Sequence, residues 1–188
     1  MKVVLSGGSG VGKTETLAEL LRRGYTVVGE AARVLLAEPQ YANYPHGGEA
    51  QRIKFQSDLL QLQSYKERNI TDKNGLVFFD RSVIDVLVFC EYLGVCDKLP
   101  LTKPPKDYDL VFILNPLETY LAKDGKGRWE TETERDHLHQ RCIDLYKQCG
   151  YEPIVLDAAS INERADKILK TIDDYTQDNV HTLLRRHD

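Results

Sequence analysis

The sequence predicts an α/β fold with three layers, in which a five-stranded parallel sheet carries helices on both faces. Five short apolar segments alternate with segments of helical periodicity, and this alternation is typical of parallel sheets that are covered on both sides. The chain has 188 residues, of which 41% are hydrophobic, and this suits one packed core. We therefore expect residues 1–188 to form a single domain.

Apolar periodicity and capping residues place the elements. Strands are expected over residues 2–6, 25–29, 75–79, 110–114 and 153–156. Helices are expected over residues 12–23, 31–38, 49–72, 82–93 and 131–150 and from 161 onward. Thr131 with Glu134, and Ser160 with Glu163, have the spacing of capping boxes at the starts of the last two helices.

Composition and charge exclude several classes of protein. No apolar run approaches the ~18–20 residues that span a bilayer, and the four cysteines include no Cys-x-x-Cys pair that would favour a zinc site. The 25 basic and 29 acidic residues give a net charge of −4, which argues against a surface built mainly for nucleic acid. We expect a cytoplasmic protein without a membrane partner. It is predicted to be a monomer or a homodimer, and the apolar segment 82–93 serves either the dimer interface or the core.

The most specific motif lies between the first strand and the first helix. It reads Gly7-Gly8-Ser9-Gly10-Val11-Gly12-Lys13-Thr14, which is a complete P-loop in the context that the motif requires. Its glycines let backbone N–H groups surround phosphate oxygens at a helix N-terminus. Lys13 can reach the β- and γ-phosphates, and the hydroxyl of Thr14 can ligate Mg²⁺. The sequence therefore predicts a P-loop NTPase fold that binds a nucleoside triphosphate with Mg²⁺. ATP is taken as the default nucleotide, because the motif does not distinguish it from GTP.

Two acidic residues follow expected strands, Glu30 after the second and Asp80 after the third. Because the carboxyl ends of parallel strands face the ligand crevice, we expect both near the triphosphate. One carboxylate can accept a hydroxyl proton and the other can hold Mg²⁺, while Arg33 and Arg81 steady phosphate charge. The alternatives are an i, i+3 ion pair at a helix start for Glu30 and Arg33, and a helix N-cap region for Asp80 and Arg81.

These residues resemble the ordered motifs of known kinases. The strings Glu30-Ala31-Ala32-Arg33, Phe55-Gln56 and Asp80-Arg81-Ser82 are similar to motifs of deoxynucleoside kinases, which usually have Glu where this chain has Asp80. The first string and the chain length resemble more closely the AAA-type ATPase/kinase domain family that includes ribosylnicotinamide kinase domains. The resemblance covers about residues 1–170. It implies that Glu30 is the base for the acceptor hydroxyl and that Gln56 reads the acceptor base.

A glycine-bearing basic loop precedes the penultimate helix. Residues 123–135 include Arg128 and Arg135, in the place where small-molecule kinases have a mobile arginine lid. We expect Arg128 to close over the phosphates and exclude water, so that transfer outpaces hydrolysis. A solvated charged turn is the alternative, because acidic residues interleave with the arginines at Glu130, Glu132 and Glu134.

The sequence thus predicts a kinase whose catalytic residues are Lys13, Glu30, Asp80 and Arg128. Mg²⁺ is assigned to Thr14 and Asp80, and the acceptor to Arg33, Gln56 and Arg81. The expected reaction moves the γ-phosphoryl group of ATP to a hydroxyl of a nucleoside, nucleotide or related small molecule. One alternative is a kinase that acts on a polynucleotide end or a modified base in DNA or RNA, which the acidic charge disfavours. The other is a nucleotide-binding switch that hydrolyses ATP or GTP, although the chain has no Asn-Lys-x-Asp string.

Overall fold

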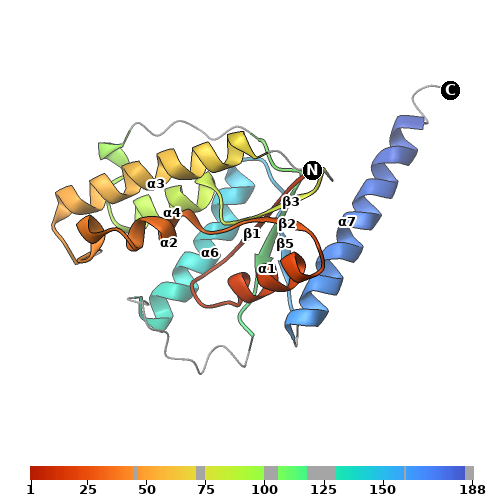
Figure 1. The fold of residues 1–188 in the computed structure, drawn as a ribbon, viewed down its shortest axis with the longest axis horizontal. Helices are drawn as coiled ribbons and strands as arrows, with labels where there is room; N and C mark the ends of the chain where they lie inside the picture. Colours follow the sequence, from red (N-terminus) through yellow and green to blue (C-terminus); the bar gives the residue numbers. More distant parts are fainter. Residues whose placement is uncertain (45, 71–74, 100–105, 118–129, 159, 185–188) are drawn as a thin grey trace.

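Five parallel strands form the centre of the molecule. The computed structural model describes residues 1–44, 46–70, 75–99, 106–117, 130–158 and 160–184. The strand order is β2-β3-β1-β4-β5 and every pairing is parallel. The strands are β1 (Lys2–Ser6), β2 (Thr26–Val28), β3 (Val77–Asp80), β4 (Leu110–Leu114) and β5 (Ile154–Leu156). The predicted α/β fold with a five-stranded parallel sheet is confirmed (Figure 1).

The helices lie where the sequence predicts them, with ends that differ by a few residues. They are α1 (Lys13–Arg22), α2 (Ala31–Leu36), α3 (Glu49–Asn69), α4 (Val83–Tyr92), α6 (Glu132–Gln148) and α7 (Ile161–Leu184). The side chain of Thr131 accepts a hydrogen bond from the backbone of Glu134 in a capping box. The backbone of Glu163 donates to Ser160 Oγ at 3.2 Å. Both predicted helix starts are therefore confirmed.

The two faces of the sheet are covered by different helices, as Figure 1 shows. In β1, Val3 and Leu5 join the core cluster that includes residues of α1 and α7. Val4, between them, joins the cluster that includes residues of α4 and α6. Because successive side chains of a strand point to opposite faces, this alternation produces the three predicted layers.

Helix α3 packs against both α2 and α4. A third core cluster joins Ala31 of α2, Phe55 and Leu59 of α3, and Val86 and Cys90 of α4. Helix α4 is therefore packed on one side against the sheet and α6, and on the other against α3. Of the two interpretations of the apolar segment 82–93, the structure favours the core.

Within the described parts of the chain, no helix is long and apolar enough to cross a bilayer. All four cysteines are free thiols.

Candidate active site

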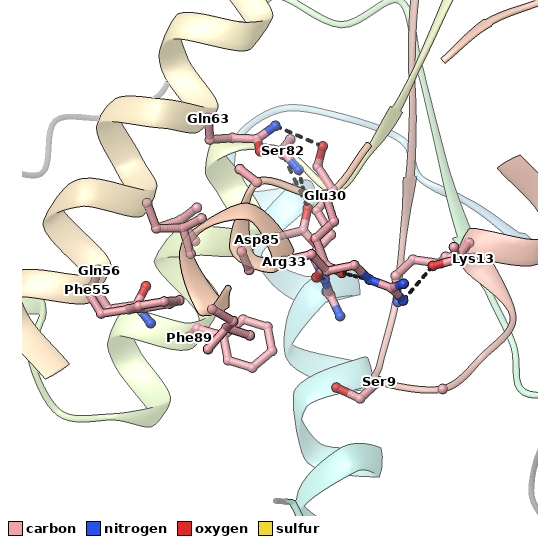
Figure 2. A pocket seen from close by; sticks show the side chains of 18 of the residues that line it. Ser9, Lys13, Glu30, Arg33, Phe55, Gln56, Gln63, Ser82, Asp85 and Phe89 are labelled. Atoms are coloured by element: carbon pink, nitrogen blue, oxygen red, sulfur yellow. Dashed lines mark hydrogen bonds and ion pairs between the residues drawn. The ribbon is translucent and has the colours of Figure 1, made fainter. Parts of the chain in front are cut away.

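Three strand ends open onto one cavity of about 480 Å³. The loop after β1 supplies Ser9 to its wall, the turn after β2 supplies Glu30, and the turn after β3 supplies Arg81. Figure 2 shows Phe55 of α3 at one side of the cavity and Lys13 at the other, with Glu30 between them and Ser9 below. The sheet thus brings the predicted strand-end residues together, as the rule for parallel sheets requires.

The loop after β1 has a backbone that only glycine adopts readily. The φ angles are 123° at Gly7, 75° at Gly10 and 85° at Gly12, a region that side chains with a Cβ rarely occupy. A Cβ at Gly7 would also lie 2.9 Å from the backbone oxygen of Leu114. Helix α1 begins directly after the loop, at Lys13. Residues 7–14 therefore form a strand-loop-helix turn with the shape that phosphate binding needs.

Lys13 is folded back onto its own loop. Its Nζ donates to the backbone oxygens of Gly7 at 3.1 Å and Gly8 at 2.6 Å, and the residue is 6% exposed. Burial, together with the charge of Arg81, lowers the pKa of Lys13 to about 8. An ammonium group with so little solvent gains when phosphate oxygens replace the two carbonyls.

Glu30 lies between two guanidinium groups. Its Oε1 accepts from Arg81 Nε at 3.0 Å, and its Oε2 accepts from Arg33 Nε at 3.1 Å. Burial acts to raise the pKa of Glu30, but Arg81 and Lys13 outweigh it and hold this pKa below its usual range. The ion pair between Glu30 and Arg33 therefore exists, and it forms part of the cavity wall.

Asp80 is buried behind the P-loop. It is 3% exposed, and its Oδ2 accepts from Thr14 Oγ1 at 3.4 Å. Its Oδ1 is buried and has no hydrogen-bond partner among the described residues. Burial and the charge of Glu30 raise the pKa of Asp80 to about 6. Asp80 is not one of the cavity-lining residues, whereas Thr14 is.

Asp80 and Thr14 fit the predicted Mg²⁺ site. Mg²⁺ is usually held by one or two carboxylates together with waters and substrate phosphates, so a carboxylate with a spare oxygen beside a hydroxyl is a suitable pair. The described residues hold no cluster of three His, Cys, Asp or Glu side chains for a metal ion.

Arg81 is held by a buried carboxylate that the sequence analysis did not identify. Arg81 has a φ of 70°, and its Nη1 donates to Asp85 Oδ1 at 3.2 Å. Asp85 also accepts from the backbone of Ser82 at 2.9 Å and from Tyr146 Oη at 2.7 Å. Ser82 is the N-cap of α4, with Asp85 completing its capping box, so Asp80 and Arg81 precede the cap rather than form it.

The other end of the cavity is aromatic. Tyr44 stacks on Phe55 with ring centroids 3.8 Å apart and an interplanar angle of 21°. Gln56 is 1% exposed; its Nε2 donates to Tyr44 Oη at 2.8 Å and its Oε1 accepts from Cys90 Sγ at 3.7 Å. All of these except Cys90 line the cavity. Recognition of an acceptor by Gln56 stays a prediction, and its amide is already engaged on both sides.

The predicted lid is only partly within the structure. Arg128 lies outside the described residues. Arg135 lies in the first part of α6, and its backbone oxygen would be 3.2 Å from a Cβ at Gly8, but its side chain is not part of the cavity wall. Glu130 does line the cavity. It is 8% exposed, and its carboxylate accepts a hydrogen bond from Ser9 Oγ at 3.0 Å. A carboxylate from this segment thus contacts the P-loop, which the sequence analysis did not foresee.

A family model described as an AAA domain matches residues 2–164. The chain belongs to the AAA domain family. This confirms the family that the sequence motifs indicated. A search of curated proteins found no significant match to this AAA domain.

Solved kinase structures share the fold of this AAA domain. The deoxyadenosine kinase from M. mycoides with bound products has a TM-score of 0.67 and 19% identity, over 93% of this chain and 99% of that chain. The thymidylate kinase from Candida albicans has a TM-score of 0.65 and 15% identity, over 93% and 92%. A NadR protein in complex with NR has a TM-score of 0.63 and 20% identity, over 94% of this chain and 51% of that chain. The predicted P-loop NTPase fold is therefore confirmed.

Proposed function

We propose that this AAA domain is an ATP-dependent phosphotransferase, which moves the γ-phosphoryl group to a hydroxyl of a nucleoside, nucleotide or related small molecule. One observation carries the proposal: a P-loop with Lys13 and a carboxylate, Glu30, line the same cavity, and its far end has the aromatic side chain of Phe55. A donor site, a proton acceptor and a surface for a planar ring are the three parts that such a transfer needs.

The transfer itself is assigned to three side chains. Lys13 exchanges the carbonyls of its own loop for the β- and γ-phosphates and stabilises their charge. Glu30 takes the proton of the acceptor hydroxyl while the hydroxyl oxygen attacks the γ-phosphorus in line and the bond to the bridging oxygen of ADP breaks. Arg81 holds Glu30 in place and offsets its charge.

Glu30 is preferred to Asp80 as the base on grounds of geometry. The pKa of Asp80 is the higher of the two, but only Glu30 lines the cavity. A base has to reach the proton before its pKa matters. In a loose phosphoryl-transfer transition state little proton transfer is needed early, so an ionised carboxylate that orients the hydroxyl is sufficient.

Thr14 and Asp80 are the residues that we propose to hold Mg²⁺. When bound, the ion neutralises charge on the β- and γ-phosphates. The buried Oδ1 of Asp80, which lacks a partner among the described residues, supports this assignment. Arg128 keeps its proposed role as the lid arginine that closes over the phosphates.

The charges around the acceptor end favour an acceptor without a phosphate group. Among the described residues that line the cavity, the basic ones are Lys13, Arg33 and Arg81. Lys13 belongs to the P-loop, and the two arginines are paired with Glu30 and Asp85. An acceptor phosphate would need a cation that is not already neutralised. Within the proposed class, we therefore favour a nucleoside-like acceptor.

The test is an acceptor panel with γ-labelled ATP and Mg²⁺. It includes nucleosides, nucleoside monophosphates, nicotinamide riboside and short oligonucleotides, with Lys13→Ala as the inactive control. Transfer of label to a nucleoside is the expected result. Preference for an oligonucleotide, or release of phosphate that no acceptor accelerates, would contradict the proposal in favour of a polynucleotide kinase or a nucleotide switch.

A further inference from the structure

A histidine side chain contacts the P-loop on the side of the loop that does not line the cavity. The Nδ1 atom of His139, on α6, accepts the backbone N–H of Gly8 at 3.2 Å. The Nε2 atom of the same ring lies 2.9 Å from Asn115 Oδ1. An amide oxygen only accepts, so Nε2 carries the proton and Nδ1 is left as the acceptor. One tautomer satisfies both contacts.

Asn115 has an orientation that the end of the sheet fixes. Its Nδ2 donates to Asp157 Oδ1 at 2.6 Å, so its amide oxygen is the atom that faces His139. Its backbone N–H donates to the carbonyl of Leu156 at 3.1 Å and extends the pairing of β4 with β5. The tautomer of His139 is therefore set by an anchored residue rather than by a mobile side chain.

The side chain of His139 also lies close to two glycines. A Cβ at Gly7 would lie 3.3 Å from Nδ1 of the ring, and a Cβ at Gly8 would lie 3.3 Å from the Cβ of His139. Gly8 precedes the first residue of α1 by five positions, so the helix does not use its N–H. Glycine backbones are the most permissive, so the peptide between Gly7 and Gly8 depends on its contacts. Lys13 Nζ and Arg81 Nη1 each donate to its carbonyl oxygen at 3.1 Å, and His139 holds its N–H on the other side.

The other end of the loop is tied to the same asparagine. Arg164 of α7, which is fully buried, donates from Nη1 to the backbone oxygen of Val11 at 2.7 Å and from Nη2 to the backbone oxygen of Asn115 at 2.6 Å. The P-loop is thus fastened to Asn115 twice, near its start through His139 and near its end through Arg164.

We propose that His139 is a positioning residue of the phosphate site, which holds the Gly8 peptide through Nδ1 in the orientation that nucleotide binding needs, with Asn115 selecting its tautomer. The inference rests on the proposed function only in that a nucleotide is the ligand of the P-loop. His139 does not line the cavity, so it acts on nucleotide affinity through the loop. Burial and Lys13 lower the pKa of His139 against the opposing charge of Asp136, which keeps the neutral form at pH 7.

The test measures the affinity for ADP and for ATP with Mg²⁺ by titration calorimetry. His139→Ala is expected to weaken both about tenfold, the equivalent of one lost hydrogen bond of about 1.4 kcal/mol. His139→Asn places an amide oxygen near the position of Nδ1 and is expected to recover most of the affinity. His139→Gln places its amide near the position of Nε2, can still meet Asn115, and is expected to behave like alanine. His137→Ala, on the exposed side of the same helix, is the matched control.

Thermal unfolding of each variant separates positioning from general loss of structure. We expect the Asn and Gln variants to unfold at similar temperatures while their nucleotide affinities differ. Equal affinity of the Ala variant and the wild type, or equal recovery by Asn and Gln, would overturn the inference. Affinities that simply follow the unfolding temperatures would overturn it as well. Calorimetry needs no acceptor, so wild-type protein that binds nucleotide but phosphorylates nothing would count against the proposed kinase and leave the His139 result intact; absence of nucleotide binding would overturn both.

Discussion

Arg81 donates its Nε to Glu30 Oε1 at 3.0 Å and so joins the turn after β3 to the turn after β2. Arg33 holds the other carboxylate oxygen at 3.1 Å. The two arginines leave the carboxylate charged at neutral pH, because their charges and that of Lys13 lower the pKa of Glu30. Glu30 therefore has a fixed position and a fixed charge at the cavity wall, and this relationship carries the first prediction.

Glu30→Gln is expected to keep the affinity for ATP within about twofold and to lower the single-turnover rate of transfer by about 10²–10⁴-fold, the usual contribution of a general base. The amide keeps the shape of the side chain but cannot take the hydroxyl proton. Rapid-quench measurement with saturating ATP isolates this step. Glu38→Gln, an exposed acid in the same region of the chain, serves as the control. Equal rates for Glu30→Gln and the wild type would remove Glu30 from the chemistry.

Lys13 makes nucleotide binding dependent on pH. Burial and Arg81 lower the pKa of Lys13 to about 8 in the free protein, and phosphate oxygens bind the ammonium form. Protonated Lys13 thus predominates below pH 8 and is lost above it, so the affinity for ATP is expected to be level below pH 7 and to fall about tenfold from pH 7 to pH 9. Calorimetry across this range checks it.

The control for this pH dependence is Lys13→Arg, whose guanidinium stays charged throughout the range. Its affinity for ATP is expected to be lower than that of the wild type but nearly constant from pH 7 to pH 9. A wild-type affinity as constant as that of the arginine variant would show that titration of Lys13 does not control binding.

The local motifs could be predicted because each consists of a few adjacent residues. The loop of residues 7–14 follows a strand and opens a helix, and Glu30 and Asp80 each follow a strand. Parallel pairing of β2, β3 and β1 then brings all three together. Neither the sequence nor the rule for strand ends placed Asp80 behind the cavity wall, because its burial depends on how α1 packs above it.

The residues that the sequence analysis missed have their partners far away in the chain. His139 contacts Gly8 across 131 positions, and Glu130 contacts Ser9 across 121. No rule based on the spacing of residues in the sequence predicts a contact between positions so far apart. Asp85 could be predicted only in part. Its spacing from Ser82 is that of a capping box, which the sequence shows. Its hydrogen bond with Tyr146, 61 positions away, depends on the fold.

Asp80 makes the stability of the fold dependent on pH. Burial and Glu30 raise the pKa of Asp80 to about 6. A carboxyl group whose pKa is higher in the folded state binds its proton more tightly there, so ionised Asp80 destabilises the fold above about pH 6, and the cost disappears as the pH falls from 6 towards 4. At 1.4 kcal/mol per pKa unit, this cost is on the order of 3 kcal/mol at pH 8.

Asp80→Asn removes that charge, so it is expected to raise the unfolding temperature clearly at pH 8 and much less at pH 5. Thermal denaturation in the absence of Mg²⁺ and nucleotide is the measurement, and the exposed Asp174→Asn is expected to change little at either pH. The same gain for Asp80→Asn at both pH values would contradict the role of burial in raising this pKa.

Glu130 places a negative charge beside the phosphate loop. Its carboxylate accepts from Ser9 Oγ at 3.0 Å and is nearly buried, so phosphate groups that enter the loop meet a charge of their own sign with little solvent between them. Glu130→Gln keeps the contact with Ser9 and removes the charge. It is expected to tighten ATP binding about three- to tenfold at low salt, with a smaller gain at high salt because of screening. Glu132→Gln, which removes an exposed charge two positions away, is the matched control for net charge. If both variants tighten binding equally, the effect comes from the overall field of the chain, and the contact between Glu130 and Ser9 has no specific role in opposing the nucleotide.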